Sequence, residues 1–253
     1  MKGADRIVAI VQARTGSSRL PGKILKKIRG KEVILHDIDR IRLIPSLDDI
    51  VIATTTSEKD DALASLVGGY GPDVKVFRGS EEDVLDRHYR AAREFDARTI
   101  VRITSDCPLI DPKVSERTIK AFLGGDCDYC SNRLVRTFPI GLDTEVFSFQ
   151  ALESAWKEAK ENYQREHVTP YIYEHPEKFR LLNVESGQDL AGLRWTLDTP
   201  EDLDFIKAVY ERLYDRGMFY MEDVLDLLRE EPELLDINKH IRHKHYKESS
   251  IGK

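Results

Sequence analysis

The sequence predicts an α/β fold in which a mostly parallel central sheet is flanked by helices. Short apolar runs rich in β-branched residues alternate with amphipathic helical patterns through the first half of the chain. Such alternation is typical of parallel strands that are joined by helical crossovers. The 253 residues, 41% of them hydrophobic, are enough for one large domain with a substantial core.

The first half of the chain supplies the parallel strands of this sheet. Strands are expected at Arg6–Gln12, Asp49–Ala53, Val74–Phe77 and Thr99–Ile103. Helices are expected near Glu32–Leu43, Glu58–Val67 and Glu81–Phe95. Sheets of this kind bind ligands beyond the carboxyl ends of their strands, so the residues directly after each strand are candidates for a site.

The second half is less regular and adds shorter elements. Further strands are expected at Asp128–Asn132, Asp143–Phe149, Arg180–Glu185 and Leu193–Leu197. Further helices are expected at Gln150–Lys160, Pro200–Tyr214 and Met221–Glu230. We expect residues 1–239 to form a single domain, with a small β-containing sub-domain or an interface insertion near residues 135–176. A charged tail is expected over residues 240–253.

The composition of the chain argues against some classes of binding partner and favours one cellular compartment. The formal net charge of −6 argues against general nucleic-acid binding, which needs an excess of positive charge. No segment approaches the roughly 18 consecutive apolar residues of a membrane span, so no membrane insertion is expected. Three cysteines are too few for a disulfide framework and favour a reducing, cytoplasmic location.

A cationic loop follows the first strand. Between Ala13 and Lys31 the chain holds seven Lys or Arg residues and no acid. Free backbone N–H groups in such a loop can wrap phosphate oxygens while the cations neutralise their charge, so the loop suits a polyphosphate. It is not a P-loop, because five residues separate Gly16 from Gly22 and Lys23 is followed by a hydrophobic residue.

Two carboxylates follow apolar runs elsewhere in the chain. Asp106 comes just after the Thr99–Ile103 strand, where a carboxylate can hold Mg²⁺ against nucleotide phosphates or cap a helix. Asp111 fits the capping role better, because a proline follows it at a favoured first helical position. Asp198 precedes an acidic helical turn that starts at Pro200, and the local pattern leaves open whether it belongs only to that turn.

Three segments resemble the signatures of sugar-activating cytidylyltransferases, which make CMP-activated acidic sugars. They are the loop Ala13–Lys23, the run Val101–Pro112 and the run Leu193–Leu203. The chain is most similar to the SpsF-like branch, named for spore-coat polysaccharide synthesis. Ser105 stands where the family usually has glycine. The resemblance implies the Rossmann-like, GT-A-like fold of nucleotide-diphospho-sugar transferases.

The resemblance also implies an activity and a set of site residues. The activity is Mg²⁺-dependent transfer of CMP from CTP to an acidic sugar or related acceptor, with release of pyrophosphate, for surface polysaccharide or glycan synthesis. Asp106 and Asp198 would bind the metal and act in catalysis together with Arg14 and Lys23. The nucleotide-binding set is Ala13, Arg14, Gly16, Ser17, Arg19, Gly22, Lys23 and Ser105.

The sequence patterns that predict acceptor binding and a homodimer also have structural explanations. The acceptor candidates are Arg87, Asp143, Glu145, Arg165 and His167. Arg87 also lies four residues after an acid, the spacing of a surface ion pair, and the others could lie at an interface or on the surface. A homodimer is expected through Val135–Pro176, which is dense in aromatic residues that could equally pack that segment's own core.

Two other functions remain open at this point. One is a glycosyltransferase that consumes a sugar nucleotide, for which Asp126-Cys127-Asp128 is formally a D-x-D motif. That motif follows a Gly-Gly pair that looks like a helix end, and the basic loop lies before the first helix, which argues against this function. The other is a non-catalytic nucleotide-sugar binding module, against which the presence of both metal-site carboxylates argues.

Overall fold

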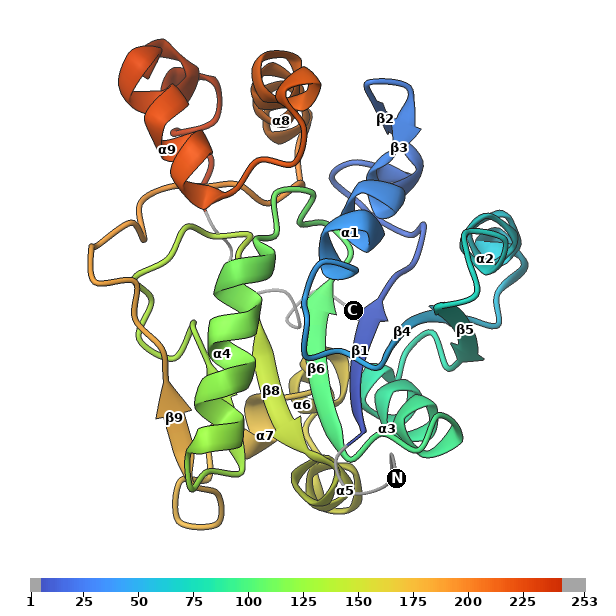
Figure 1. Cartoon of the computed structure of the whole chain (residues 1–253). Coiled ribbons are helices and arrows are strands. Elements are labelled where there is room, and N and C mark those ends of the chain that lie inside the picture. The colour runs from blue at the N-terminus through green and yellow to red at the C-terminus, as the bar shows by residue number, and fades with distance from the viewer. Residues whose placement is uncertain (1–5, 243–253) are drawn as a thin grey trace.

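A seven-stranded sheet forms the centre of the computed structural model, which describes residues 6–242 (Figure 1). Residues 243–253 of the expected tail lie outside the described range. The spatial order of the strands is β5-β4-β1-β6-β8-β7-β9. The strands are β1 (Ile7–Gln12), β4 (Asp49–Thr55), β5 (Val74–Gly79), β6 (Thr99–Thr104), β7 (Tyr129–Ser131), β8 (Glu145–Ser148) and β9 (Leu181–Asn183).

The first half of the sheet confirms the predicted parallel arrangement. Strands β5, β4, β1 and β6 run parallel to one another. In the pair of β1 and β6, Val8 lies opposite Ile100 and Gln12 lies opposite Thr104. The helices that connect these strands fall where they were expected. They are α1 (Val33–Ile41), α2 (Asp61–Gly68) and α3 (Val84–Glu94).

Several elements lie outside the ranges expected for helices and strands, and two features among them bear on the site. Helix α4 (Pro112–Gly124) follows β6, and the Asp111 side chain caps it by accepting the N–H groups of Lys113 and Val114. A hairpin of β2 (Lys27–Ile28) and β3 (Lys31–Glu32) lies inside the cationic segment. Its two-residue turn has φ of 51° at Arg29 and 81° at Gly30, and glycine adopts such positive angles without strain.

The second half of the chain continues the sheet with a reversal of direction. Strand β8 is antiparallel to both β6 and β7, whereas β9 is parallel to β7. Residues 135–176 therefore contribute a strand to the central sheet. The same segment supplies the helices α5 (Phe149–Glu158), α6 (Asn162–His167) and α7 (Pro170–Tyr173).

The expected strand Leu193–Leu197 does not form. Only Arg194 makes a β-bridge, to Ile140. The backbone N–H of Trp195 donates to the Ile140 carbonyl at 2.7 Å, but that of Leu197 donates to the Asp106 carbonyl at 2.8 Å. The segment therefore crosses from one neighbour to another instead of pairing with a single strand.

Helices cover both faces of the sheet, and alternate residues of β1 point into the two resulting cores. Ala9 and Val11 belong to the core under α1, α4 and the C-terminal helices, and Val8 and Ile10 to the core under α3, α5 and α7. Most aromatic residues of the 135–176 segment pack inside these cores, with Trp156 stacked on Tyr89 at 4.1 Å. These rings therefore give little support to an intermolecular interface.

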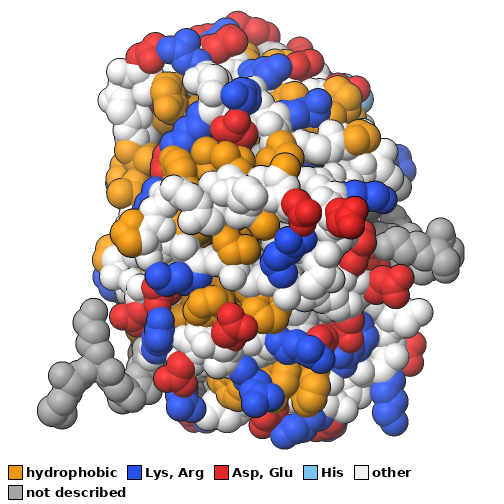
Figure 2. Space-filling view, turned by 90° about the vertical axis from the view of Figure 1, so that its right-hand side faces the viewer, with side chains coloured by type: hydrophobic (Ala, Val, Ile, Leu, Met, Phe, Trp, Pro, Cys, Tyr) orange, Lys and Arg blue, Asp and Glu red, His pale blue; other side chains and the backbone are white. Residues whose placement is uncertain are grey.

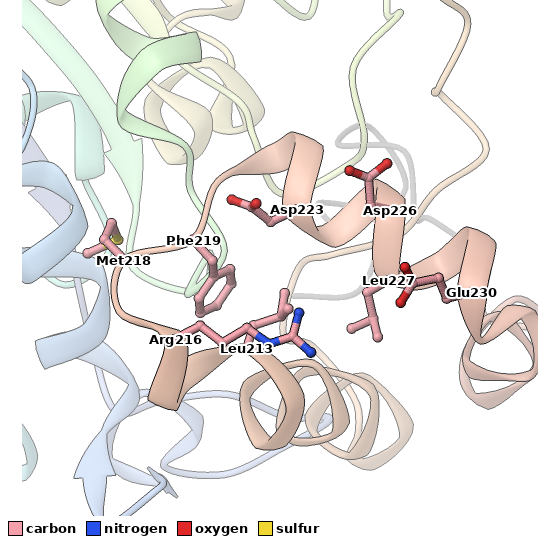
Figure 3. A pocket seen from close by; sticks show the side chains of 8 residues that line it. All are labelled: Leu213, Arg216, Met218, Phe219, Asp223, Asp226, Leu227 and Glu230. Carbon is pink, nitrogen blue, oxygen red and sulfur yellow. The ribbon is translucent and has the colours of Figure 1, made fainter.

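The chain ends with α8 (Pro200–Leu213), α9 (Met221–Glu230) and the 3₁₀ helix η4 (Pro232–Ile237). A pocket of about 260 Å³ lies between α8 and α9, with Phe219 and Leu227 beside acidic side chains (Figure 3). Basic and acidic side chains are interspersed on the face that Figure 2 shows, rather than gathered by sign. Within residues 6–242 we find no helix with the length and apolar character needed to cross a membrane.

Candidate active site

A cavity of about 890 Å³ opens at the edge of the sheet where β1 and β6 end and β8 begins. Its walls come from separate stretches of the chain: the cationic loop, the start of α3, the end of β6 with the turn after it, the segment from β7 to β8, residues 166–173, and residues 196–198. Most of the predicted site residues line it. They are Ala13, Arg14, Gly16, Ser17, Arg19, Lys23, Arg87, Ser105, Asp106, Asp143, Glu145, His167 and Asp198.

A buried carboxylate anchors the cationic loop. Asp60 Oδ1 accepts hydrogen bonds of 2.7 Å from both the backbone N–H and the hydroxyl of Thr15. The hydroxyl of Thr55 donates to the other oxygen. Burial alone would raise the pKa of Asp60, but these hydrogen bonds lower it and keep the group ionised. Sequence reasoning missed this residue.

Gly22 closes the loop rather than lining the cavity. Its backbone N–H donates to the Thr15 carbonyl at 3.1 Å, so this group is already engaged within the loop. Its φ of 64° is in the left-handed region, which glycine reaches without a steric penalty. The chain then turns into a short 3₁₀ helix, η1 (Lys23–Leu25), which begins with the lysine of the site.

Lys23 brings the two predicted metal-binding carboxylates together. Its Nζ lies 2.6 Å from Asp106 Oδ2 and 2.8 Å from Asp198 Oδ1. Arg19 adds a second cation, 3.0 Å from the same oxygen of Asp198. Burial would raise the pKa of Asp198, but Lys23, Arg19 and Arg194 lower it to about 2. Both carboxylates therefore converge on one point beside the cationic loop.

A second layer of buried groups supports Asp198. Asp202 in the first turn of α8 accepts the backbone N–H groups of Asp198 at 2.9 Å and Thr199 at 3.0 Å. Arg194 donates two hydrogen bonds of 2.8 Å to the two oxygens of Asp202 and one of 3.1 Å to Asp198. Asp202 has no exposed surface. The acidic turn is thus the support of the site, and Asp198 projects from it.

Glu145 is the centre of a charged cluster at the other end of the cavity. It forms an ion pair with Arg102 and accepts hydrogen bonds of 2.6 Å from the hydroxyls of Tyr129 and Thr169. Burial opposes ionisation of Glu145, but Arg102 and Arg133 outweigh it and lower the pKa to about 2. This residue is therefore a fixed negative charge in the wall.

Arg133 is the cation of this cluster that is least engaged by the protein. Its guanidinium lies 3.6 Å from Glu145 and 3.8 Å from Asp143, longer than hydrogen bonds. Asp143 is instead held by two hydrogen bonds from Arg136, of 2.6 and 2.7 Å. Burial opposes the charge of Arg133, but the neighbouring carboxylates raise its pKa. No local sequence pattern marked this residue.

The segment that carries Arg133 is closed at its base by Asn132. The side-chain amide of Asn132 donates to the Leu142 carbonyl at 2.7 Å, and its oxygen accepts the Thr144 N–H at 2.9 Å. Asn132 is fully buried. The C-terminal end of residues 133–143 is therefore fastened to the residue that precedes Arg133.

Arg87 and Arg165, both predicted to contact the acceptor, have different environments. Arg87 lines the cavity, and its Nε has no hydrogen-bond partner within residues 6–242. Burial and the nearby Arg14 lower its pKa to about 10. Arg165 does not line the cavity, because its guanidinium is bound to Asp83 at 2.6 Å and to the Trp156 carbonyl at 2.7 Å. Arg165 is thus a structural link between α3 and α6.

The residues at the loop fit a divalent metal shared with a nucleotide. In the described part of the chain no three His, Cys, Asp or Glu side chains surround one point. Mg²⁺ in nucleotide sites commonly takes one or two carboxylates, with phosphate and water oxygens completing its shell. The convergent oxygens of Asp106 and Asp198 meet that requirement.

The D-x-D sequence does not take part in the site. Asp126 and Asp128 both pair with Arg180, and neither lines the cavity. The motif is therefore a surface ion-pair cluster, which removes the specific support for a glycosyltransferase.

A cationic loop and paired carboxylates at the carboxyl edge of an α/β sheet define a nucleotide-binding enzyme. Residues 8–233 match the cytidylyltransferase family model, and the chain belongs to this family. It is 40% identical over 245 residues to an uncharacterized protein of Methanocaldococcus jannaschii, covering 96% of this chain and 98% of the relative. It is 33% identical over 234 residues to the spore coat polysaccharide biosynthesis protein SpsF of Bacillus subtilis, covering 90% and 95%.

A solved structure agrees with this assignment. The structure of a cytidylyltransferase from Leptospira borgpetersenii serovar Hardjo-bovis matches with a TM-score of 0.86 and 30% identity. The match covers 96% of this chain and all of that one. The expected nucleotidyltransferase fold and the cytidylyltransferase assignment are thereby confirmed.

Proposed function

We propose that this enzyme transfers CMP from CTP to an acidic sugar or a chemically related acceptor, with Mg²⁺ as its metal and pyrophosphate as the leaving group. The observation that carries this proposal is the convergence of Asp106 and Asp198 on one point beside the cationic loop. Similarity to a spore coat polysaccharide protein supports a role in surface glycan synthesis. Cytoplasmic location is part of the proposal, because free cysteines suit a reducing compartment.

The loop residues would hold the triphosphate and prepare it for attack. Arg14, Arg19 and Lys23 present cations to the cavity, and Gly16 leaves room for the backbone to approach the phosphates. A bound Mg²⁺ would neutralise charge on the phosphate oxygens. An acceptor hydroxyl releases its proton to solvent, and its oxygen bonds to the α-phosphorus. The bond from that phosphorus to the oxygen bridging to the β-phosphate breaks, and pyrophosphate leaves.

The Glu145 end of the cavity would hold the acceptor. Arg133 is a partly exposed cation whose carboxylate neighbours lie beyond hydrogen-bond distance, so it can bind an incoming carboxylate. His167 and Tyr173 also line the cavity. Asp143 and Glu145 keep the cluster rigid, because their charges are already engaged by arginines.

The direct test is a pyrophosphate-release screen of the four nucleoside triphosphates against a panel of acidic sugars. CTP with an acidic sugar should give the highest rate. The variant Arg133→Ala should raise the KM for the acidic sugar with little effect on the KM for CTP. Preference for ATP or GTP would contradict the proposed nucleotide, and equal use of neutral sugars would contradict the proposed acceptor.

A further inference from the structure

The Lys23 ammonium lies where the oxygens of the two carboxylates meet. It is within 2.8 Å of Asp198 Oδ1 and closer still, 2.6 Å, to Asp106 Oδ2. Its side chain is only 13% exposed, so water cannot readily replace these contacts. Two partly buried carboxylates that share a site repel each other unless a cation lies between them. Lys23 supplies that cation.

These carboxylate oxygens are also the ones that a shared metal would take. Mg²⁺ binds oxygens at about 2.0–2.1 Å and must be within reach of both carboxylates at once. The ammonium already fills the space between them, so the ammonium and a metal ion compete for the same two oxygens. The backbone of Lys23 is fixed by its N–H bond to the Leu20 carbonyl at 3.1 Å. Only the flexible four-carbon side chain has to move to clear the position.

We infer, building on the proposed function, that Lys23 is a tethered cation that occupies the metal position in the nucleotide-free enzyme. The anionic oxygens of CTP draw the ammonium away from the carboxylates. Metal then binds together with the nucleotide, not before it. Since coupling between two ligands is reciprocal, metal tightens nucleotide binding by the same factor.

Direct measurement of metal binding tests this without relying on turnover. Mn²⁺ serves as the probe, and its free concentration is followed by electron paramagnetic resonance with no nucleotide present. The variant Lys23→Met should bind Mn²⁺ at least about tenfold more tightly than the parent enzyme, because two carboxylates are left without their cation. Lys23→Gln, which keeps a polar side chain, provides a second reading if the methionine variant unfolds.

Arg19→Gln is the matched control. It removes the same formal charge at 3.0 Å from Asp198, but Arg19 contacts only one of the two carboxylates and its side chain is 36% exposed. Its effect on Mn²⁺ affinity should stay within about threefold, as expected for a partly exposed ion pair. With a non-hydrolysable α,β-methylene CTP analogue present, the parent enzyme should gain most of the affinity that Lys23→Met already has.

Three results would overturn the inference. Mn²⁺ affinity unchanged or weakened in both Lys23 variants would mean that the ammonium does not block the site. An equal increase in Mn²⁺ affinity in Arg19→Gln would mean that the loss of any nearby positive charge has this effect, and not the position of Lys23. Failure of Mn²⁺ to bind the parent enzyme even with the CTP analogue would also remove the metal from the proposed function. That last outcome is distinguishable from the first, in which metal still binds with nucleotide.

Discussion

Asn238 donates its side-chain amide to Asp202 Oδ1 at 3.1 Å and to the Arg194 carbonyl at 2.9 Å. Asn238 follows η4 and is 4% exposed, so these bonds are shielded from water. Through Asp202, which accepts the Asp198 N–H, the last described part of the chain is connected to a carboxylate of the candidate active site.

Asn238→Ala should therefore weaken both stability and metal-dependent activity. Loss of the amide leaves two buried acceptors short of a donor, at a cost of about 1–3 kcal/mol in the free energy of unfolding. The Mg²⁺ concentration for half-maximal rate should rise, while the KM for the acceptor stays near that of the parent. Urea unfolding and a Mg²⁺ titration check this, with the exposed Lys239→Ala as the neighbouring control. An unchanged Mg²⁺ requirement with lowered stability would make the link purely structural.

Lys23→Ala should weaken CTP binding. A charge-assisted hydrogen bond to phosphate is commonly worth about 1.5–3 kcal/mol, so the dissociation constant should rise roughly ten- to a hundredfold. Calorimetry with CTP measures this directly. The same variant should bind Mn²⁺ more tightly without nucleotide, and opposite signs for the two ligands are the signature of Lys23 exchanging between them. Unchanged CTP affinity would remove Lys23 from the phosphate site.

Asp106→Asn and Asp198→Asn should behave as one unit. Each variant should lose most turnover while remaining folded, because each removes one of the two carboxylates that converge at Lys23. The double variant should be little worse than either single one, as is usual for residues that act together. Turnover numbers for the three variants decide. Losses that simply multiply would show that the carboxylates act independently.

Glu145 should make the free energy of unfolding depend on pH in the acidic range. Its pKa in the folded protein is about 2, below the ordinary value of 4.5, so the folded state favours the ionised form. The resulting stabilisation, on the order of 3 kcal/mol, is present above the ordinary value and is lost as the pH falls towards 2. Urea unfolding between pH 7 and pH 3 should show a steeper loss for the parent than for Glu145→Gln. The exposed Glu94→Gln serves as the control and should follow the parent.

The homodimer stays a prediction, and its location can be probed at Val135. This residue belongs to the segment 135–176 and is 58% exposed, whereas most aromatic side chains of the segment are inside the protomer. Val135→Asp should convert a dimer to a monomer by light scattering, and Leu123→Asp, which changes an apolar residue 48% exposed on α4, should not. A monomer mass for the parent at micromolar concentrations would end the dimer hypothesis.

The sequence was sufficient to predict a part of the site where the residues that form an element and the residues proposed to bind the ligand are neighbours in the chain. The run into β1 and the loop to Lys23 could be predicted because an apolar strand, glycines and cations follow one another directly. The prediction of a strand at Leu193–Leu197 was wrong because it relied on the local pattern alone. Its buried Trp195 and Leu197 alternate like strand residues, but their N–H groups have partners on two different segments. No local pattern encodes that choice of partners.

Residues whose roles arise only from tertiary contacts were missed. Asp60 is a loop anchor because Thr15, 45 positions earlier, reaches its carboxylate. Arg133 is part of the site because its guanidinium lies 3.6 Å from Glu145, a contact that only the fold creates. Conversely, a charged residue in a recurring stretch says little about what it faces, and Arg165 turned out to be bound to Asp83.

Strand β8 runs antiparallel to β6, so the chain enters β8 at the same edge of the sheet at which it leaves β6. The cationic loop and Asp106 follow β1 and β6 where these strands leave the sheet, whereas Asp143 and Glu145 lie where the chain enters β8. Asn132 joins the two ends of residues 133–143, and the segment between them also bonds to residues 183–195, for example from Val135 N–H to Asn183 and from Ile140 N–H to the Leu193 carbonyl. Exchange of residues 133–143 together with their partners at residues 183–193 for those of another cytidylyltransferase should change the range of accepted sugars and leave the affinity for CTP unchanged. We therefore expect that acceptors can diversify in such a scaffold without a change to the residues proposed to bind the nucleotide.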